Sequence, residues 1–96
     1  MTGKIEIENV NTPGRTTRVD AAKYHAMRDA LLHVLPDGDE GITAKAAVEK
    51  CKAHLPDELF PGGKAAGWWQ KTVQLDLEAK GLVRRLPNKP LTFARA

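Results

Sequence analysis

The chain has 96 residues and a formal net charge of +3; 42% of its residues are hydrophobic and 28% are charged. This length and composition predict one small globular domain with a single core, and they exclude a disordered tail. No stretch approaches the roughly 20 apolar residues of a membrane span, and the N-terminus is polar, so we expect a cytoplasmic protein with no membrane partner. The single Cys51 excludes an internal disulfide and is expected to be a small buried hydrophobe.

The positive charge is concentrated in the C-terminal third of the chain. Residues 1–60 carry eight Lys and Arg against ten Asp and Glu, whereas residues 61–96 carry seven against two. This distribution would draw a polyanion to the C-terminal segment. The alternative is that these lysines and arginines are ordinary solvated surface residues.

The N-terminal segment predicts one strand followed by an extended arm. Residues 4–10 alternate isoleucine with glutamate, which is typical of a half-buried strand. Pro13 and Gly14 then predict a turn within an extended connector. We expect residues 1–18 to form an N-terminal strand and arm packed on a domain made of residues 19–96.

Two helices are predicted next. Asp20 can cap a first helix that runs to about Val34, because its carboxylate accepts hydrogen bonds from the free amides of the first turn. Thr43 can cap a second helix, which carries apolar residues at helical spacing and is closed by Pro56. The lone apolar Ile42 lies between them, where winged-helix proteins often place a short bridging strand.

The segment GWWQKTVQLDLEAKGLVRR, residues 67–85, predicts a third helix that ends at Gly81 and leads directly into a basic strand. Residues 82–86 and 91–95 are predicted to form two strands, joined by a turn with a proline at each end. The predicted fold is therefore α+β: a winged helix-turn-helix with three helices, a two-stranded C-terminal wing, and an extra N-terminal strand and arm.

The two adjacent tryptophans fall on different faces of the third helix. At about 100° per residue, one apolar stripe is expected to face the core; it consists of Ala66, Trp69, Val73 and Leu77. Trp68 and Leu75 belong to a second apolar stripe. Either the N-terminal strand and arm cover Trp68, or Phe60, Trp68 and Leu75 form part of a homodimer interface.

The remaining face of the third helix is polar, and with the wing it forms a candidate surface for duplex DNA. Glutamine can bond adenine bidentately, and lysine or arginine can donate to guanine or to phosphate. The expected major-groove residues are Lys64, Gln70, Lys71 and Gln74, and the expected phosphate contacts are Arg84, Arg85 and Lys89. Arg15 and Arg18 on the arm either reach a minor groove or solvate a loop. The hypothesis requires the polar face and the wing to lie open to solvent, side by side.

Other chemistry finds little support in the sequence. The three histidines and one cysteine lack zinc-finger spacing, and the chain contains no serine nucleophile. Gly62-Gly63-Lys64 is followed by Ala65, where a phosphate-binding P-loop requires Ser or Thr. We therefore expect no enzyme activity, no metal, no cofactor and no small-molecule substrate. The alternative to DNA binding is a protein-interaction or homodimerisation module.

Three segments resemble a family of uncharacterised bacterial proteins of about 100 residues with a winged-helix-like fold. They are VNTPGRTTRVDAAKY (residues 10–24), HLPDELFPGGKAAGWW (residues 54–69) and KTVQLDLEAKGLVRR (residues 71–85). The resemblance spans nearly the whole chain and implies a bacterial, cytosolic protein. It assigns no catalytic or binding residue, because the family carries no known activity.

Overall fold

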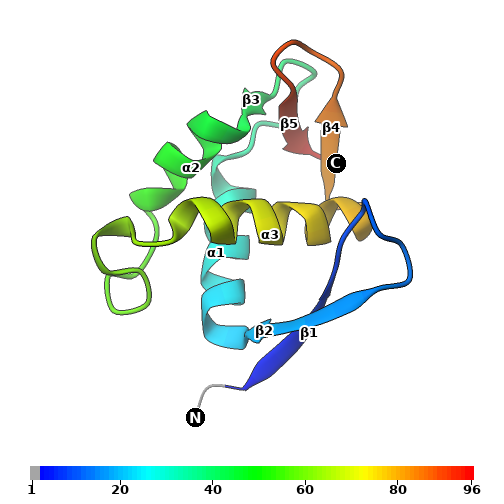
Figure 1. Ribbon diagram of the computed structural model, residues 1–96. Helices are drawn as coiled ribbons and strands as arrows, with labels where there is room; N and C mark the ends of the chain where they lie inside the picture. Colours follow the sequence, from blue (N-terminus) through cyan, green and yellow to red (C-terminus); the bar gives the residue numbers. More distant parts are fainter. Residues whose placement is uncertain (1–2) are drawn as a thin grey trace.

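The computed structural model describes residues 3–96 (Figure 1). It is an α+β fold with three helices, as the sequence predicts, and with two small antiparallel sheets. The elements in chain order are β1 (Lys4–Glu8), β2 (Thr16–Asp20), α1 (Ala21–Val34), β3 (Ile42–Thr43), α2 (Ala44–Lys52), a 3-10 turn (Pro61–Gly63), α3 (Ala66–Ala79), β4 (Val83–Leu86) and β5 (Thr92–Arg95). One sheet pairs β1 with β2, and the other has the order β3-β5-β4.

The first two helices begin at the predicted caps. The Asp20 side chain accepts a hydrogen bond from the Lys23 amide at 3.0 Å, and the Thr43 hydroxyl accepts one from the Ala46 amide at 3.1 Å. Each contact satisfies an amide that has no partner within its helix. α2 ends at Lys52, earlier than predicted from the position of Pro56.

The second strand of the N-terminal sheet was not predicted. Residues expected to form an extended arm instead form β2, which pairs with β1 so that Ile5 lies opposite Val19 and Ile7 opposite Thr17. The β1–β2 hairpin buries Ile7 and Val19 in the same core as the helices. The sequence of β2 shows no alternation of apolar and polar residues, because Val19 is its one apolar residue, and the strand was therefore not predicted.

The C-terminal strands agree closely with prediction. β4 and β5 form the expected hairpin, and β3 adds to it where Ile42 lies opposite Phe93. Phe93 is buried, so the sheet closes one end of the helical core.

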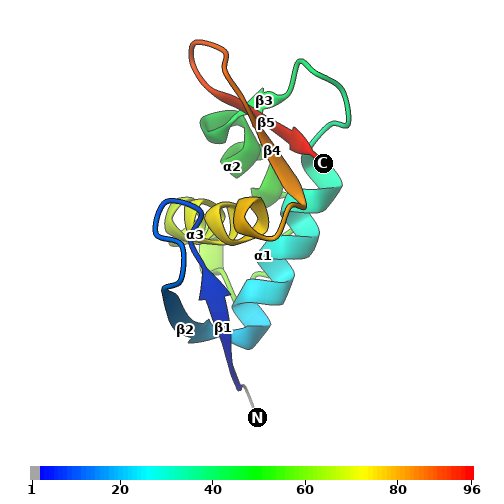
Figure 2. The ribbon, with the colours of Figure 1, turned by 90° about the vertical axis from the view of Figure 1, so that its right-hand side faces the viewer.

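α3 is the central element of the molecule. Figure 2 views it nearly along its axis and shows α1 on one side and the loop of the β1–β2 hairpin on the other. The tip of the β4–β5 hairpin leans towards the same side as that loop. The largest fully buried apolar side chains are those of Met27, Leu31, Leu35, Cys51, Phe60, Val73 and Leu77. α3 therefore contributes to the core and also borders the side on which both hairpins project.

Candidate nucleic-acid interface

α3 begins after Lys64, which was predicted to lie on the polar face of this helix. Ala65 adopts a left-handed conformation with φ of 62°, and the helix begins at Ala66. Lys64 therefore lies just before the helix, at the end of the 3-10 turn, and is exposed. Its side chain is exposed to solvent but does not lie on a face of the helix.

The prediction that Gln70 and Gln74 lie on an open polar face was wrong. They are 2% and 5% exposed, respectively. The Gln70 amide donates to the Gln74 carbonyl oxygen at 2.6 Å, and the Gln74 amide donates to Glu78 at 3.3 Å. Residues four apart lie on one side of a helix, so these side chains satisfy one another without solvent. Neither amide is open to a base.

The predicted phosphate contacts of the wing are engaged within the protein. Arg85 makes two hydrogen bonds to the Glu78 carboxylate, at 2.9 and 3.1 Å. Arg84 donates to the Asp39 carboxylate at 3.2 Å and to backbone carbonyls of the loop between α1 and β3. Acidic partners that the sequence did not reveal thus neutralise both arginines. Lys89, in the β4–β5 turn, remains exposed.

The exposed face of α3 includes Trp68 and Lys71. Trp68 is 58% exposed, so neither the N-terminal strand nor the loop that follows it covers the ring as predicted. Phe60 is 2% exposed and packs edge-on against Trp69, with ring centroids 6.3 Å apart, which removes it from the proposed interface. Leu75 is half-buried.

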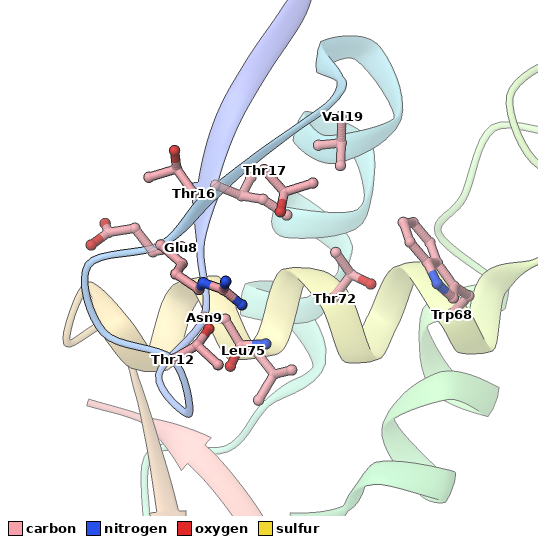
Figure 3. Close-up of a pocket in the computed structure, with 11 residues that line it drawn as sticks. Glu8, Asn9, Thr12, Thr16, Thr17, Val19, Trp68, Thr72 and Leu75 are labelled. Atoms are coloured by element: carbon pink, nitrogen blue, oxygen red, sulfur yellow. The ribbon is translucent and has the colours of Figure 1, made fainter.

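A groove of about 560 Å³ separates this face of α3 from the β1–β2 hairpin (Figure 3). Trp68, Thr72 and Leu75 form the α3 wall, as Figure 3 shows. The hairpin wall consists of Ile7, Glu8, Asn9, Thr12, Arg15, Thr16, Thr17 and Val19. The volume of the groove lies within the range of about 300–1,000 Å³ that is typical of ligand sites.

Arg15 is the cation that lines the groove, and it takes part in no ion pair with any residue that the structure describes. Among residues 3–96, the ion pairs involve none of Arg15, Lys64, Lys71 or Lys89. The one carboxylate that lines the groove, Glu8, lies 4.0 Å from the Lys80 ammonium. The sequence left open whether Arg15 reaches a minor groove or solvates a loop, because its position depends on the pairing of β2 with β1, which was not predicted.

A buried carboxylate fixes the position of the hairpin on α3. Asp76 is 0% exposed and accepts hydrogen bonds from the Tyr24 hydroxyl, the Lys80 ammonium and, at 2.8 Å, the Glu8 amide. The adjacent Leu75 carbonyl accepts a hydrogen bond from the Val10 amide at 3.3 Å. α1, α3 and β1 are thereby joined at one point, which determines the width of the groove.

This cluster makes the stability of the fold sensitive to alkaline pH. Burial, and then the hydrogen bond to Asp76, raise the pKa of Tyr24 well above its usual value near 10. Above about pH 10 the unfolded chain loses the phenolic proton while the folded chain keeps it, so the free energy of unfolding falls as pH rises, by up to about 1.4 kcal/mol per pH unit. Denaturant unfolding between pH 8 and about pH 11 should show this fall, and Tyr24→Phe should reduce it.

Because Tyr24 is the single tyrosine of the chain, tyrosinate absorbance reports this group alone. An alkaline titration of the folded protein with an ordinary phenol midpoint would contradict the raised pKa. Equal slopes in the two proteins would contradict the link to stability.

Cys51 and the histidines are the remaining candidates for a reactive or metal-binding site. Cys51 is fully buried, and burial raises the pKa of its thiol to about 11, so it is uncharged at neutral pH. In residues 3–96 no group of three or more His, Cys, Asp or Glu side chains is placed to hold a metal ion. No helix in the same range is long and apolar enough to cross a membrane.

These observations define a small α+β domain with a groove between an N-terminal hairpin and its last helix. The chain belongs to the family of unknown function DUF6958, whose profile matches residues 4–93. No curated protein and no solved structure matches the chain. The interpretation of the groove therefore depends on its own residues.

Proposed function

We propose that this protein is a winged-helix domain that binds duplex DNA through the exposed face of α3. The order of α1, β3, α2, α3, β4 and β5, with β3 joining β5, supports the winged-helix assignment. In such domains the third helix approaches the nucleic acid and the wing contacts the backbone. The proposal adds the β1–β2 hairpin as a second flank of that helix.

The observation that carries this proposal is that four cations on α3 and the segments beside it take part in no ion pair within the described part of the chain. Lys71 lies on the exposed face of α3, Lys64 just before the helix, Arg15 in the groove and Lys89 on the wing. Unpaired cations can bind phosphates without first breaking an ion pair, whereas Arg84 and Arg85 would have to leave their carboxylates. The proposed DNA contacts are therefore these four cations, in place of the buried glutamines and the paired arginines.

Binding is expected to depend on salt. With about four phosphates neutralised, the logarithm of the affinity should fall against the logarithm of salt concentration with a slope of roughly −3.6, at about −0.9 per phosphate. Lys71→Gln should weaken binding to all duplex sequences alike and reduce the slope by about 0.9. Fluorescence anisotropy with a labelled duplex over a series of salt concentrations measures both effects.

Lys50→Gln is the matched control, because Lys50 is an exposed lysine of α2, outside the proposed contacts. It removes the same charge and should leave the slope unchanged. Failure to bind duplex at low salt, or equal effects of the two substitutions, would refute the proposed surface.

The exposed Trp68 supports a second candidate function, docking of a protein partner or of a second copy. Trp68 and the half-buried Leu75 line the same groove, and Val10 on the hairpin loop is 37% exposed. Exposed aromatic residues in apolar patches are enriched in interfaces. Light scattering distinguishes this function from the first: a dimer that Trp68→Ala dissociates would favour homodimerisation, and a monomer in both proteins would oppose it.

A further inference from the structure

The Trp68 ring is 58% exposed and is supported by a second aromatic ring. It packs edge-to-face against Trp69, with centroids 5.1 Å apart and planes at 82°. Trp69 is 8% exposed and belongs to the core, so Trp68 rests on a fixed support. A tryptophan presented in this way can stack on a planar ligand at little cost in side-chain entropy.

The hairpin wall of the groove is polar and carries a cation. Its lining residues include three threonines, at positions 12, 16 and 17, together with Asn9 and Arg15. Thr72 lies on the α3 wall between Trp68 and Leu75 (Figure 3). Hydroxyl, amide and guanidinium groups are the usual donors to phosphate and sugar oxygens. An apolar helix of a partner would leave these groups without hydrogen bonds, which is costly. The one carboxylate of the lining, Glu8, lies 4.0 Å from the Lys80 ammonium, whereas Arg15 takes part in no ion pair among residues 3–96, so the groove fits a ligand with a planar face and a negatively charged group.

The hairpin also restricts how a duplex can approach. Because the Val10 amide bonds the Leu75 carbonyl, the hairpin covers the C-terminal half of α3. The major groove, about 12 Å wide, admits one helix or one two-stranded ribbon. α3 with the hairpin beside it is wider than either, so the N-terminal half of the helix is the part open to a duplex. The groove itself is open to a single strand.

We propose that the groove between α3 and the β1–β2 hairpin binds an unpaired nucleotide of a nucleic acid, with the base stacked on Trp68 and the phosphates held by Arg15 and Lys71. This inference rests on the proposed function and narrows it to DNA in which a duplex adjoins a single-stranded segment. Stacking of bases on aromatic side chains beside a basic groove is the general mode of single-strand binding.

The test compares a blunt duplex with the same duplex carrying a short single-stranded extension, by fluorescence anisotropy at one salt concentration. The extension should raise the affinity about tenfold, which corresponds to about 1.4 kcal/mol. Trp68→Ala should remove this gain, and Trp68→Phe, which keeps an aromatic ring, should retain most of it. Protection of the exposed tryptophan from acrylamide quenching should accompany binding of the extended duplex.

Arg15 and Arg18 supply a matched pair for the charged contact. Arg15 lines the groove, whereas Arg18 is exposed on the same strand region but does not line it. Arg15→Gln should reduce the gain from the extension several-fold, and Arg18→Gln should leave that gain intact.

The outcomes separate this inference from the proposed function. If neither DNA binds, both are wrong. If the blunt duplex binds through Lys71 but the extension adds nothing, or the gain survives Trp68→Ala, the proposed function stands and the unpaired-nucleotide site is refuted. A dimer in free solution that Trp68→Ala dissociates would assign the groove to a second copy and would also refute the site.

Discussion

Replacing Asp76 by alanine is expected to lower the free energy of unfolding by about 3 kcal/mol, because removing one partner from a buried charged cluster leaves the others without compensation. The Tyr24 hydroxyl and the Glu8 amide would lose their acceptor inside the fold, while Lys80, whose side chain is 36% exposed, would turn to solvent. For a domain of this size the melting temperature should fall by more than about 10 °C. Thermal and denaturant unfolding followed by circular dichroism measure both quantities.

Asp29→Ala is the matched control, since Asp29 is an exposed helical aspartate whose partner is the neighbouring Arg28. Surface pairs of this kind contribute little, and the substitution should change stability by no more than about 0.5 kcal/mol. A loss below about 1 kcal/mol for Asp76→Ala would show that the buried cluster does not hold the fold together.

The cluster around Asp76 also links stability to the proposed site. The Glu8 amide that it binds and the Val10 amide bound by the Leu75 carbonyl are the hydrogen bonds that seat the hairpin on α3. The width of the groove, and the distance from Arg15 to Trp68 across it, therefore depend on a carboxylate that contacts neither proposed ligand group. Asp76 is thus a positioning residue for the groove.

Local signals in the sequence were sufficient for the helices and the β4–β5 hairpin. Asp20 and Thr43 cap α1 and α2 as predicted, because a cap depends on residues within one turn of it. The β4–β5 hairpin follows from the turn between its strands, which is also a local feature. The boundaries were within three or four residues at each of these elements.

The groove was harder to predict from the sequence, because the contacts that form it join residues far apart in the chain. β2 pairs through its backbone, and its threonines and arginine carry no periodic signal. The glutamines were assigned to a solvent face because they are polar, although Gln70 lies only about 20° from Leu77 around the helix. A helix packed by α1, α2 and a sheet in so small a domain buries more than one stripe.

One missed residue did leave a signal. At about 100° per residue, Asp76 falls within about 20° of Trp69, on the stripe that was predicted to face the core. A carboxylate on a buried stripe requires a partner, and the chain contains one tyrosine, on the first helix, that could supply it. In the structure, the Asp76 carboxylate accepts hydrogen bonds from that tyrosine, Tyr24, and from Lys80, which lies one turn after it.

Gly41→Ala is expected to cost about 3 kcal/mol of folding free energy, for two additive reasons. Gly41 has a φ of 64°, which costs a side-chain-bearing residue of order 1 kcal/mol or more. A Cβ there would also lie 2.8 Å from the Phe93 carbonyl oxygen and 2.9 Å from a Leu86 methyl group. Relieving such overlaps requires shifts of packed groups that typically cost another 1–3 kcal/mol. Denaturant unfolding of the variant measures the sum.

Gly62→Ala isolates the first of these costs. Gly62 has nearly the same φ, 62°, but a Cβ there would meet no atom within 4 Å. The difference between the two variants therefore measures the steric contact alone, which we expect to be about 2 kcal/mol. The contact is hard to relieve because Arg84 ties the loop before Gly41 to the β4–β5 hairpin through the Asp37 and Gly38 carbonyls. Equal losses in the two variants would mean that the β4–β5 hairpin moves away from this loop at little cost, and would contradict the predicted steric contact.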